Sequence, residues 1–156
     1  MANESPAEIQ LRLPSQLRWL GVVDAVVQGF AAEFALSADD VNNLSTAAIE
    51  AASNAMEHAN KFDESKHVTL HLRGHGSAID IEVEDEGPGF DPRPYERELS
   101  AEDLLKLRGR GIFIMRSFMD EVRFTRAPQG GMCVHLRKVG RPIADESGPS
   151  DATSSN

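Results

Sequence analysis

Two hydrophobic periods alternate along the chain and predict its helices and strands. Residues 9–13 alternate apolar and polar side chains, which predicts a half-buried strand. Between residues 15 and 34 the apolar positions recur at steps of three and four, as on a helix that packs one stripe into the core. Capping residues at 37–40 then open a second, alanine-rich helix that is expected to run to about Asn60.

Beyond residue 66 the hydrophobic period changes to two. Residues 68–73 and 79–84 each alternate apolar with polar side chains, and the intervening residues 74–77 contain two glycines. This pattern predicts a β-hairpin with one apolar and one polar face. The polar face of the first strand is basic and that of the second is acidic, so we expect ion pairs across the two strands.

The rest of the chain predicts two more helices and a second hairpin. A short helix is opened by Ser100, and the residues 109–111 lead into an apolar helix. Strands over residues 122–126 and 132–138 are joined by a turn that contains proline and glycine. Helices and strands segregated in this order predict an α+β fold, a two-layer sandwich whose mostly antiparallel sheet is covered on one face by helices.

Length and composition are those of one acidic domain. The chain has 156 residues, and its 16 basic and 25 acidic side chains give a net charge of −9. Such a charge repels a phosphate backbone, so a direct nucleic-acid partner is not expected. We predict a domain over residues 9–138, with a disordered N-terminus at residues 1–8 and a disordered tail at residues 139–156.

The sequence favours a cytoplasmic protein that does not bind membranes. No apolar stretch approaches the roughly 20 residues needed to cross a bilayer, and the first residues lack the pattern of a secretory signal. Cys133 is the one cysteine, so it cannot form an internal disulfide. It falls on the polar side of a predicted strand, and we interpret it as structural.

Asp85 is the first candidate for binding chemistry. It shares strand parity with the apolar residues before it and should therefore point into the core, where a carboxylate needs a partner. Gly87 and Gly89 follow, and glycines at a strand end allow a backbone to approach a ligand closely. The alternative is that the strand has already turned outward at Asp85.

Two further clusters have the residue types of a phosphate or metal site. Glu50, Asn54 and His58 stand four residues apart on the alanine-rich helix, and a carboxylate and an amide oxygen on one face could hold Mg²⁺ together with phosphate oxygens. Arg108 and the residues 109–111 stand at the predicted start of a helix, where free N–H groups bind anions. The alternatives are a solvated helix face and an ordinary loop.

Several other signals are weak or absent. The three histidines at 67, 71 and 75 have helical metal-ligand spacing, but on a strand four residues span about 13 Å, too far for one metal. The phosphate-binding loop pattern and the motifs of eukaryotic-type protein kinases are absent.

The three clusters, in this order, resemble a known family. Residues 50–59 resemble the asparagine box of the GHKL (Bergerat) ATPases, which include gyrase and the histidine kinases. Residues 85–90 resemble their first glycine box, and residues 109–122 resemble the second in the form found in bacterial anti-sigma-factor serine kinases. The similarity spans about residues 9–138.

The resemblance implies a role for each candidate residue. Asp85 would bind the adenine amino group of ATP, Asn54 would coordinate Mg²⁺, and Glu50 would act as the catalytic base. The remaining members of the implied nucleotide site are His58, Gly87, Gly89, Phe90, Arg108, Gly109, Arg110 and Gly111. Residues 91–108 would form a short lid over the nucleotide.

The resemblance also implies a function. It predicts an ATP- and Mg²⁺-dependent serine/threonine protein kinase that phosphorylates a small anti-sigma-factor antagonist and sequesters a sigma factor, as a homodimer. The alternative is a sequestering module of the same fold without phosphotransfer. One departure bears on this choice, because many members carry threonine after the last glycine pair, where this chain has Met132 and Cys133.

Overall fold

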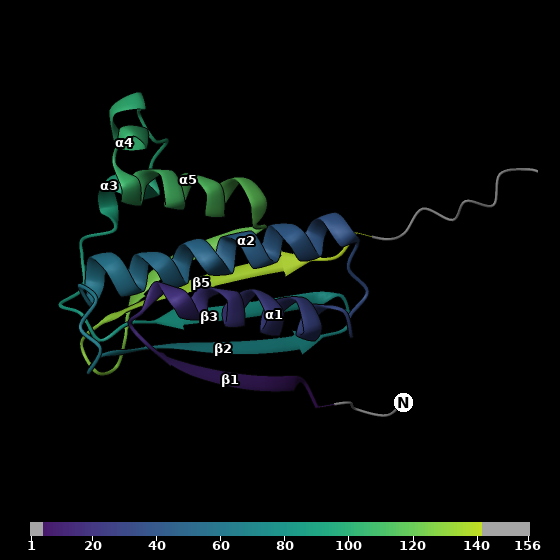
Figure 1. The fold of residues 1–156 in the computed structure, drawn as a ribbon. Coiled ribbons are helices and arrows are strands. Elements are labelled where there is room, and N and C mark those ends of the chain that lie inside the picture. Colours follow the sequence, from purple (N-terminus) through teal and green to yellow (C-terminus); the bar gives the residue numbers. More distant parts are fainter. Residues whose placement is uncertain (1–4, 142–156) are drawn as a thin grey trace, which may run out of the picture.

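Five strands form one sheet in the order β1-β2-β3-β5-β4, and each neighbouring pair is antiparallel. The structure, a computed structural model, describes residues 5–141 without the side chains of Tyr95 and Leu107 (Figure 1). The strands are β1 (Ala7–Pro14), β2 (His67–His75), β3 (Ala78–Glu84), β4 (Glu121–Arg126) and β5 (Met132–Val139).

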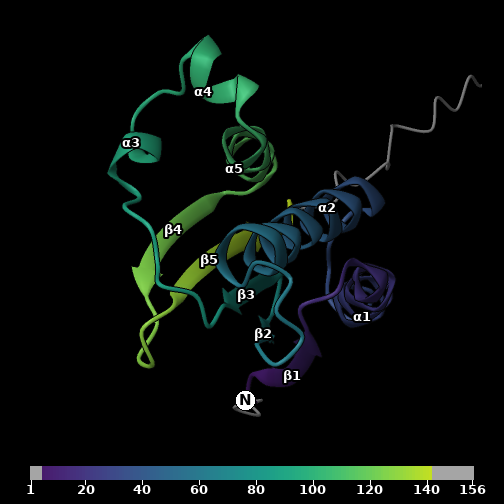
Figure 2. The same ribbon diagram turned by 60° about the vertical axis from the view of Figure 1, so that its left-hand side comes forward.

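Helices cover one face of this sheet (Figure 2). The long helices are α1 (Leu20–Ala31), α2 (Ala38–Asn54) and α5 (Leu107–Phe118), and the short ones are α3 (Arg93–Glu96) and α4 (Ala101–Leu105). A 3₁₀ turn (η1, Leu17–Trp19) precedes α1, and a π-helical turn (η2, Ala55–Ala59) continues α2. The predicted two-layer α+β sandwich is therefore confirmed. No helix within residues 5–141 is long and apolar enough to cross a membrane.

The core lies where the hydrophobic periods predict it. On β2 and β3 the fully buried residues are Val68, Leu70, Leu72, Ile79 and Ile81, and on α1 they include Val23 and Val27. The helix above them is alanine-rich on its buried side, with Ala47, Ala48, Ala51 and Ala52 inaccessible to solvent or nearly so. Short side chains bring the axis of α2 close to the sheet, so the polar groups at its C-terminal end lie near the strand ends.

The ordered domain extends one to two residues beyond each of its predicted ends. Strand β1 begins at Ala7, because Ala7 and Glu8 pair with Gly74 and Arg73 of β2. At the other end β5 runs to Val139, and the N–H of Gly140 donates to the carbonyl of Ser77 at 2.7 Å. Most of the predicted disordered tail lies outside the described residues.

A buried lysine joins three elements at the end of the sandwich where α2 begins. Lys138 is 5% exposed although it lies on a strand, and its Nζ donates to the carbonyl of Phe118 at 2.8 Å. It also lies 3.5 Å from Oδ1 of Asp40. Because both charges are buried, each compensates the desolvation of the other. The contacts of Lys138 with Asp40 and with the carbonyl of Phe118 join β5 to the start of α2 and the end of α5.

Candidate active site

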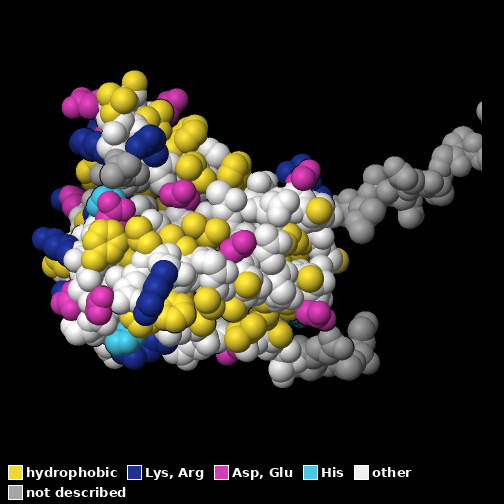
Figure 3. All heavy atoms as spheres, viewed as in Figure 1, with side chains coloured by type: hydrophobic (Ala, Val, Ile, Leu, Met, Phe, Trp, Pro, Cys, Tyr) yellow, Lys and Arg dark blue, Asp and Glu magenta, His cyan; other side chains and the backbone are white. Residues whose placement is uncertain are grey.

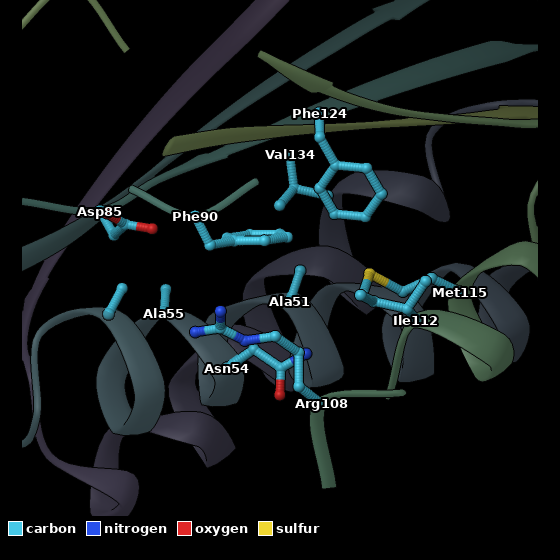
Figure 4. A pocket seen from close by; sticks show the side chains of 11 residues that line it. Ala51, Asn54, Ala55, Asp85, Phe90, Arg108, Ile112, Met115, Phe124 and Val134 are labelled. Atoms are coloured by element: carbon cyan, nitrogen blue, oxygen red, sulfur yellow. The ribbon is translucent and has the colours of Figure 1, made fainter. Parts of the chain in front are cut away.

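A cavity of about 330 Å³ opens between the C-terminal part of α2, α5 and the ends of β3 and β5. This volume includes open solvent, and side chains leave little enclosed space within it. The lining residues come from five segments: Ala51, Asn54, Ala55, Ala59, Asp85, Phe90, Arg108, Ile112, Met115, Phe124 and Val134 (Figure 4). Most of this wall is apolar, and Asp85, Asn54 and Arg108 supply its polar groups.

Asp85 is held in place by backbone N–H groups. Its Oδ1 accepts hydrogen bonds from the N–H of Gly87 at 3.0 Å and of Met132 at 3.1 Å. In Figure 4 a carboxylate oxygen of Asp85 points toward Phe90. Asp85 is only 9% exposed, as its strand parity predicts. The carboxylate therefore presents one fixed acceptor to a ligand.

Burial raises the pKa of Asp85, although the two backbone hydrogen bonds and the charge of Arg108 oppose this shift. The ionised form is thus less favourable here than in water. A ligand that donates a hydrogen bond to the exposed oxygen would compensate this energy, and an aromatic amino group in an apolar cavity has that chemistry.

The predicted glycines allow backbones to approach one another behind the cavity wall. A Cβ at Gly87 would lie 2.5 Å from the carbonyl oxygen of Ala59, and a Cβ at Gly131 would lie 1.9 Å from that of Asp85. Gly89 has φ of +79°, which a side chain disfavours. The segment after β3 is therefore packed tightly between η2 and the β4–β5 turn.

Asn60 positions the same segment, and the sequence patterns did not identify it. It is 1% exposed, and its Nδ2 donates to Ser15 Oγ at 2.9 Å and to the carbonyl of His67 at 3.0 Å. Its Oδ1 accepts from the N–H of Glu86, next to Asp85, at 2.9 Å. In the sequence, Asn60 is simply an asparagine at the end of a predicted helix. Hydrophobic periodicity does not distinguish a buried asparagine at that position from an exposed helix cap.

Glu50 and Asn54 lie on one face of α2, as their spacing predicts. Both approach Gly111 of α5, where a Cβ would lie 3.1 Å from Glu50 Oε2 and 2.8 Å from Asn54 Nδ2. Carboxylate and amide oxygens are ligands that Mg²⁺ prefers, so the pair fits a magnesium site. Asn54 lines the cavity, and Glu50 lies next to Asn54 against Gly111.

His58 does not extend this polar face into the cavity, which corrects the prediction. The π-helical turn η2 shifts the register, because the N–H of Asn60 bonds to the carbonyl of Ala55 five residues earlier. Ala59 therefore lines the cavity in place of His58. The Nε2 of His58 is buried without a hydrogen-bond partner among the described residues.

The start of α5 also differs from the prediction. The helix begins at Leu107, and the N–H of Arg110 donates to the carbonyl of Lys106 at 3.1 Å, so the glycines lie within its first turns. A Cβ at Gly109 would lie 1.8 Å from the carbonyl oxygen of Asp103, so this glycine lets α4 pack onto α5. An anion-binding role for Gly109, Arg110 and Gly111 therefore stays a prediction; in the structure both glycines make packing contacts, and Arg110 is exposed outside the cavity.

Phe90 and Arg108 fill the middle of the cavity (Figure 4). The guanidinium of Arg108 lies 4.4 Å from the centre of the Phe90 ring, and that ring meets Phe124 edge-on at 5.7 Å. A ligand bound to Asp85 would extend through the space that Phe90 occupies. Both side chains must therefore move when a nucleotide-sized molecule enters.

Charged side chains of both signs gather on the outside around α3, α4 and the start of α5 (Figure 3). The capping box of α4 belongs to this region, where Ser100 and Asp103 exchange hydrogen bonds of 3.0 and 3.1 Å, as predicted. Arg116 of α5 donates to the carbonyl of Arg97 at 3.2 Å. The Arg116 contact is exposed and the capping box is partly buried, so the segment is held over the cavity more weakly than a buried core would hold it.

Comparison with known proteins agrees with this geometry. The family described as histidine kinase-like ATPase domain matches residues 13–138. The chain is 31% identical over 122 residues to the serine-protein kinase RsbW of Bacillus licheniformis, covering 74% of this chain and 76% of the relative. It is 25% identical over 152 residues to the serine-protein kinase RsbW of Listeria monocytogenes, covering 94% and 96%.

A solved structure supports the fold. The crystal structure of the RsbU and RsbW domains of a Mycobacterium tuberculosis protein superposes with a TM-score of 0.59 at 15% identity. The match covers 89% of this chain and 34% of that longer one. Taken with the match over residues 13–138, these similarities show that the chain belongs to the family of histidine kinase-like ATPase domains, among relatives that include the RsbW serine-protein kinases.

Proposed function

We propose that this protein is an ATP- and Mg²⁺-dependent serine/threonine kinase that phosphorylates a small anti-sigma-factor antagonist and sequesters a sigma factor. The names of the relatives support the kinase activity. The observation that carries the proposal is the cavity itself, with a fixed carboxylate at one end and the Glu50–Asn54 pair beside the other.

Each group has a distinct task in this proposal. The free oxygen of Asp85 accepts the adenine amino group, and the apolar walls formed by Ala55 and Ile112 contact the faces of the base. Asn54 holds Mg²⁺, which offsets phosphate charge when it is bound. Arg108 supplies a further positive charge to the phosphates.

Glu50 acts as the general base in the transfer. It takes the proton from the hydroxyl of the substrate serine or threonine while that oxygen forms a bond to the γ-phosphorus. The bond between the γ-phosphorus and its bridging oxygen breaks, and ADP leaves. Glu50 then releases its proton to water.

Nucleotide entry requires the start of α5 to move. In the described arrangement Gly111 lies directly against Glu50 and Asn54, and Phe90 with Arg108 fills the cavity. The segment from α3 to the first turn of α5 therefore acts as the lid. Its mostly exposed contacts make such a movement inexpensive compared with opening the sheet.

Calorimetric titration of the purified protein with ATP tests the nucleotide site. We expect binding that requires Mg²⁺ and is abolished in Asn54→Ala, because this substitution removes the metal ligand. Asn42→Ala is the matched control, since Asn42 is an exposed asparagine on the same helix. Binding that is independent of Mg²⁺, or unchanged in Asn54→Ala, would contradict the assignment.

Transfer of labelled phosphate from ATP tests the kinase step. The acceptors are recombinant candidate antagonist proteins, with their phosphorylatable serine or threonine replaced by alanine as the negative control. Glu50→Gln should bind ATP as the wild-type protein does and lose transfer by at least about 100-fold. Transfer at the wild-type rate in Glu50→Gln would contradict the role of Glu50 as base.

A sequestering module without phosphotransfer is the second candidate, and Met132 is the observation that favours it. The side chain of Met132 lies at the edge of the adenine end, with its sulfur 3.4 Å from where a Cβ of Gly89 would be. ATP binding without transfer to any acceptor, together with a stable complex with a sigma factor, would support this candidate. We also propose a cytoplasmic homodimer, and light scattering of the purified protein tests the dimer.

A further inference from the structure

A cluster of metal-ligand side chains lies on the open face of the sheet, opposite the helices. Glu82 of β3 and Cys133 and His135 of β5 each offer one ligand atom, and these atoms all lie within 4.8 Å of one another. The cavity described above lies on the covered face, so this cluster has no part in the proposed nucleotide site.

The sheet register brings the three side chains together. Cys133 and His135 are two residues apart on one strand and therefore share a face. Glu82 pairs directly with His135 across β3 and β5, which makes it the diagonal neighbour of Cys133. Because the backbones of both strands lie inside the sheet, the ligand positions are fixed by paired strands rather than by a loop.

The ring of His135 is already oriented for metal binding. Its Nε2 hydrogen-bonds to Oγ1 of Thr125 on β4 at 2.8 Å, and its Nδ1 faces Oε1 of Glu82 at 3.4 Å. Metal-bound histidines commonly donate their second ring N–H to such an outer partner, which sets the tautomer. With Nε2–H donated to Thr125, the lone pair of Nδ1 is directed toward Glu82 and Cys133.

Two carboxylates lie beside the thiol of Cys133, which is only 4% exposed. Glu84 pairs directly with Cys133 across β3 and β5, and Glu82 is its diagonal neighbour. The same carboxylates attract a divalent cation, which would release the thiol proton to water on binding. A solvent-open hollow lined by Glu82, Arg123 and His135 borders the cluster and gives ions access.

We propose that Glu82, Cys133 and His135 bind a zinc ion, with water as its fourth ligand. One sulfur, one imidazole nitrogen and one carboxylate oxygen are a ligand set that suits Zn²⁺ in tetrahedral geometry. Oε1 of Glu82 lies 3.4 Å from Nδ1 of His135 and 3.2 Å from Arg73, so a metal ion bound there would compete with Arg73 for this carboxylate.

Titration of the reduced, full-length protein with Zn²⁺ against a chromophoric chelator tests the site, and Co²⁺ serves as the spectroscopic probe. We expect one zinc ion per chain and a thiolate-to-cobalt charge-transfer band. Cys133→Ser should abolish that band, and both Cys133→Ser and His135→Asn should weaken zinc binding by more than about 100-fold. Thr125→Val should weaken binding by about 10- to 100-fold, because it removes the outer partner of the histidine.

His75→Asn is the matched control, since His75 is exposed at the far end of β2. It should bind zinc as the wild-type protein does. Cobalt binding without the thiolate band, unchanged affinity in Cys133→Ser, or equal losses in His75→Asn and His135→Asn would each overturn the proposal. His135 is partly exposed, and the thermal unfolding midpoint of metal-free His135→Asn verifies that any loss of binding is not a loss of fold.

Discussion

The two faces of the sheet accommodate carboxylates in opposite ways. On the open face Glu82 lies 3.2 Å from Arg73, and Asp80 lies 3.1 Å from Arg137, with all four side chains in contact with solvent. On the covered face Asp85 is buried and is held by backbone N–H groups. Exposed pairs contribute little to stability and are readily replaced, whereas a buried carboxylate lowers stability unless a ligand compensates it.

The comparison indicates where function and stability conflict. Ion pairs between the β2 and β3 strands follow from the alternation of basic and acidic residues, and their removal should have little effect. The covered face instead holds buried polar groups, which need hydrogen bonds or a ligand to compensate their burial. Five substitutions test this contrast, from the largest expected effect to the smallest.

Asn60→Ala should have the largest effect on stability. It removes one buried and two partly buried hydrogen bonds, and the N–H of Glu86 and the carbonyl of His67 lose this partner. We expect the free energy of unfolding to fall by about 3 kcal/mol or more. Urea denaturation measures it, and the exposed Asn42→Ala should change it by less than about 0.5 kcal/mol. A loss below 1 kcal/mol in Asn60→Ala would contradict the role of Asn60 in positioning the segment after β3.

Asp85→Asn should weaken ATP binding by about 10- to 100-fold. The substitution removes the negative charge and replaces one acceptor oxygen for the adenine amino group by an amide N–H₂ donor. Calorimetry measures the affinity. Asp80→Asn on the open face is the control and should leave it unchanged. Wild-type affinity in Asp85→Asn would exclude the adenine contact.

The same substitution should raise stability at neutral pH. Because burial raises the pKa of Asp85 in the folded state, its contribution to stability is fully present below the unfolded pKa and is lost as the pH rises through the folded pKa. An uncharged asparagine avoids this loss, so the melting temperature of Asp85→Asn should exceed that of the wild type at pH 7 and not at pH 3. An equal difference in melting temperature at both pH values would contradict a raised pKa of Asp85 in the folded state.

Gly111→Ala and Gly29→Ala should have opposite effects, although both glycines lie in helices. A Cβ at Gly111 meets Asn54 and Glu50, and we expect a loss of about 1–2 kcal/mol in the free energy of unfolding. Nothing lies within 4 Å of a Cβ at Gly29 of α1, and alanine should add about 0.5–1 kcal/mol there. Thermal unfolding of both variants gives the comparison. A gain in Gly111→Ala would show that α5 does not rest on α2 in solution.

Arg73→Ala should have the smallest effect. Arg73 is 3.2 Å from both Glu8 and Glu82 but is about half exposed, so we expect a loss of at most about 1 kcal/mol. The loss should shrink in high salt because screening weakens exposed pairs. Denaturation at low and high ionic strength measures this. A salt-independent loss above 2 kcal/mol in the free energy of unfolding would contradict the inference that ion pairs on the open face contribute little to stability.

Much of the fold follows from local pattern. The alternation on β2 and β3, the apolar stripe of α1 and the capping box at Ser100 each depend on residues within one or two turns of each other. The inward direction of Asp85 follows from strand parity in the same way. Such features are decided by neighbours along the chain, so they could be read without the tertiary structure.

Other parts of the site could not be predicted in this way. The displacement of His58 by a single π-helical turn leaves no trace in the hydrophobic period. The partners of Asn60 are 45, 7 and 26 residues away in the sequence. Gly109 and Gly111 were expected to bind an anion, whereas their contacts come from α4 and α2, which only the packed structure brings near.

The sequence by itself determined the two-layer class, the hairpins and the three clusters that carry the family resemblance, because periodicity and motif spacing are properties of the chain. Only the tertiary structure decided that β5 lies between β3 and β4, that Phe90 and Arg108 fill the cavity, and that Cys133 is buried beside Glu82 and His135. These features depend on contacts between distant segments. Their free energies are set by burial and register, which no local pattern specifies.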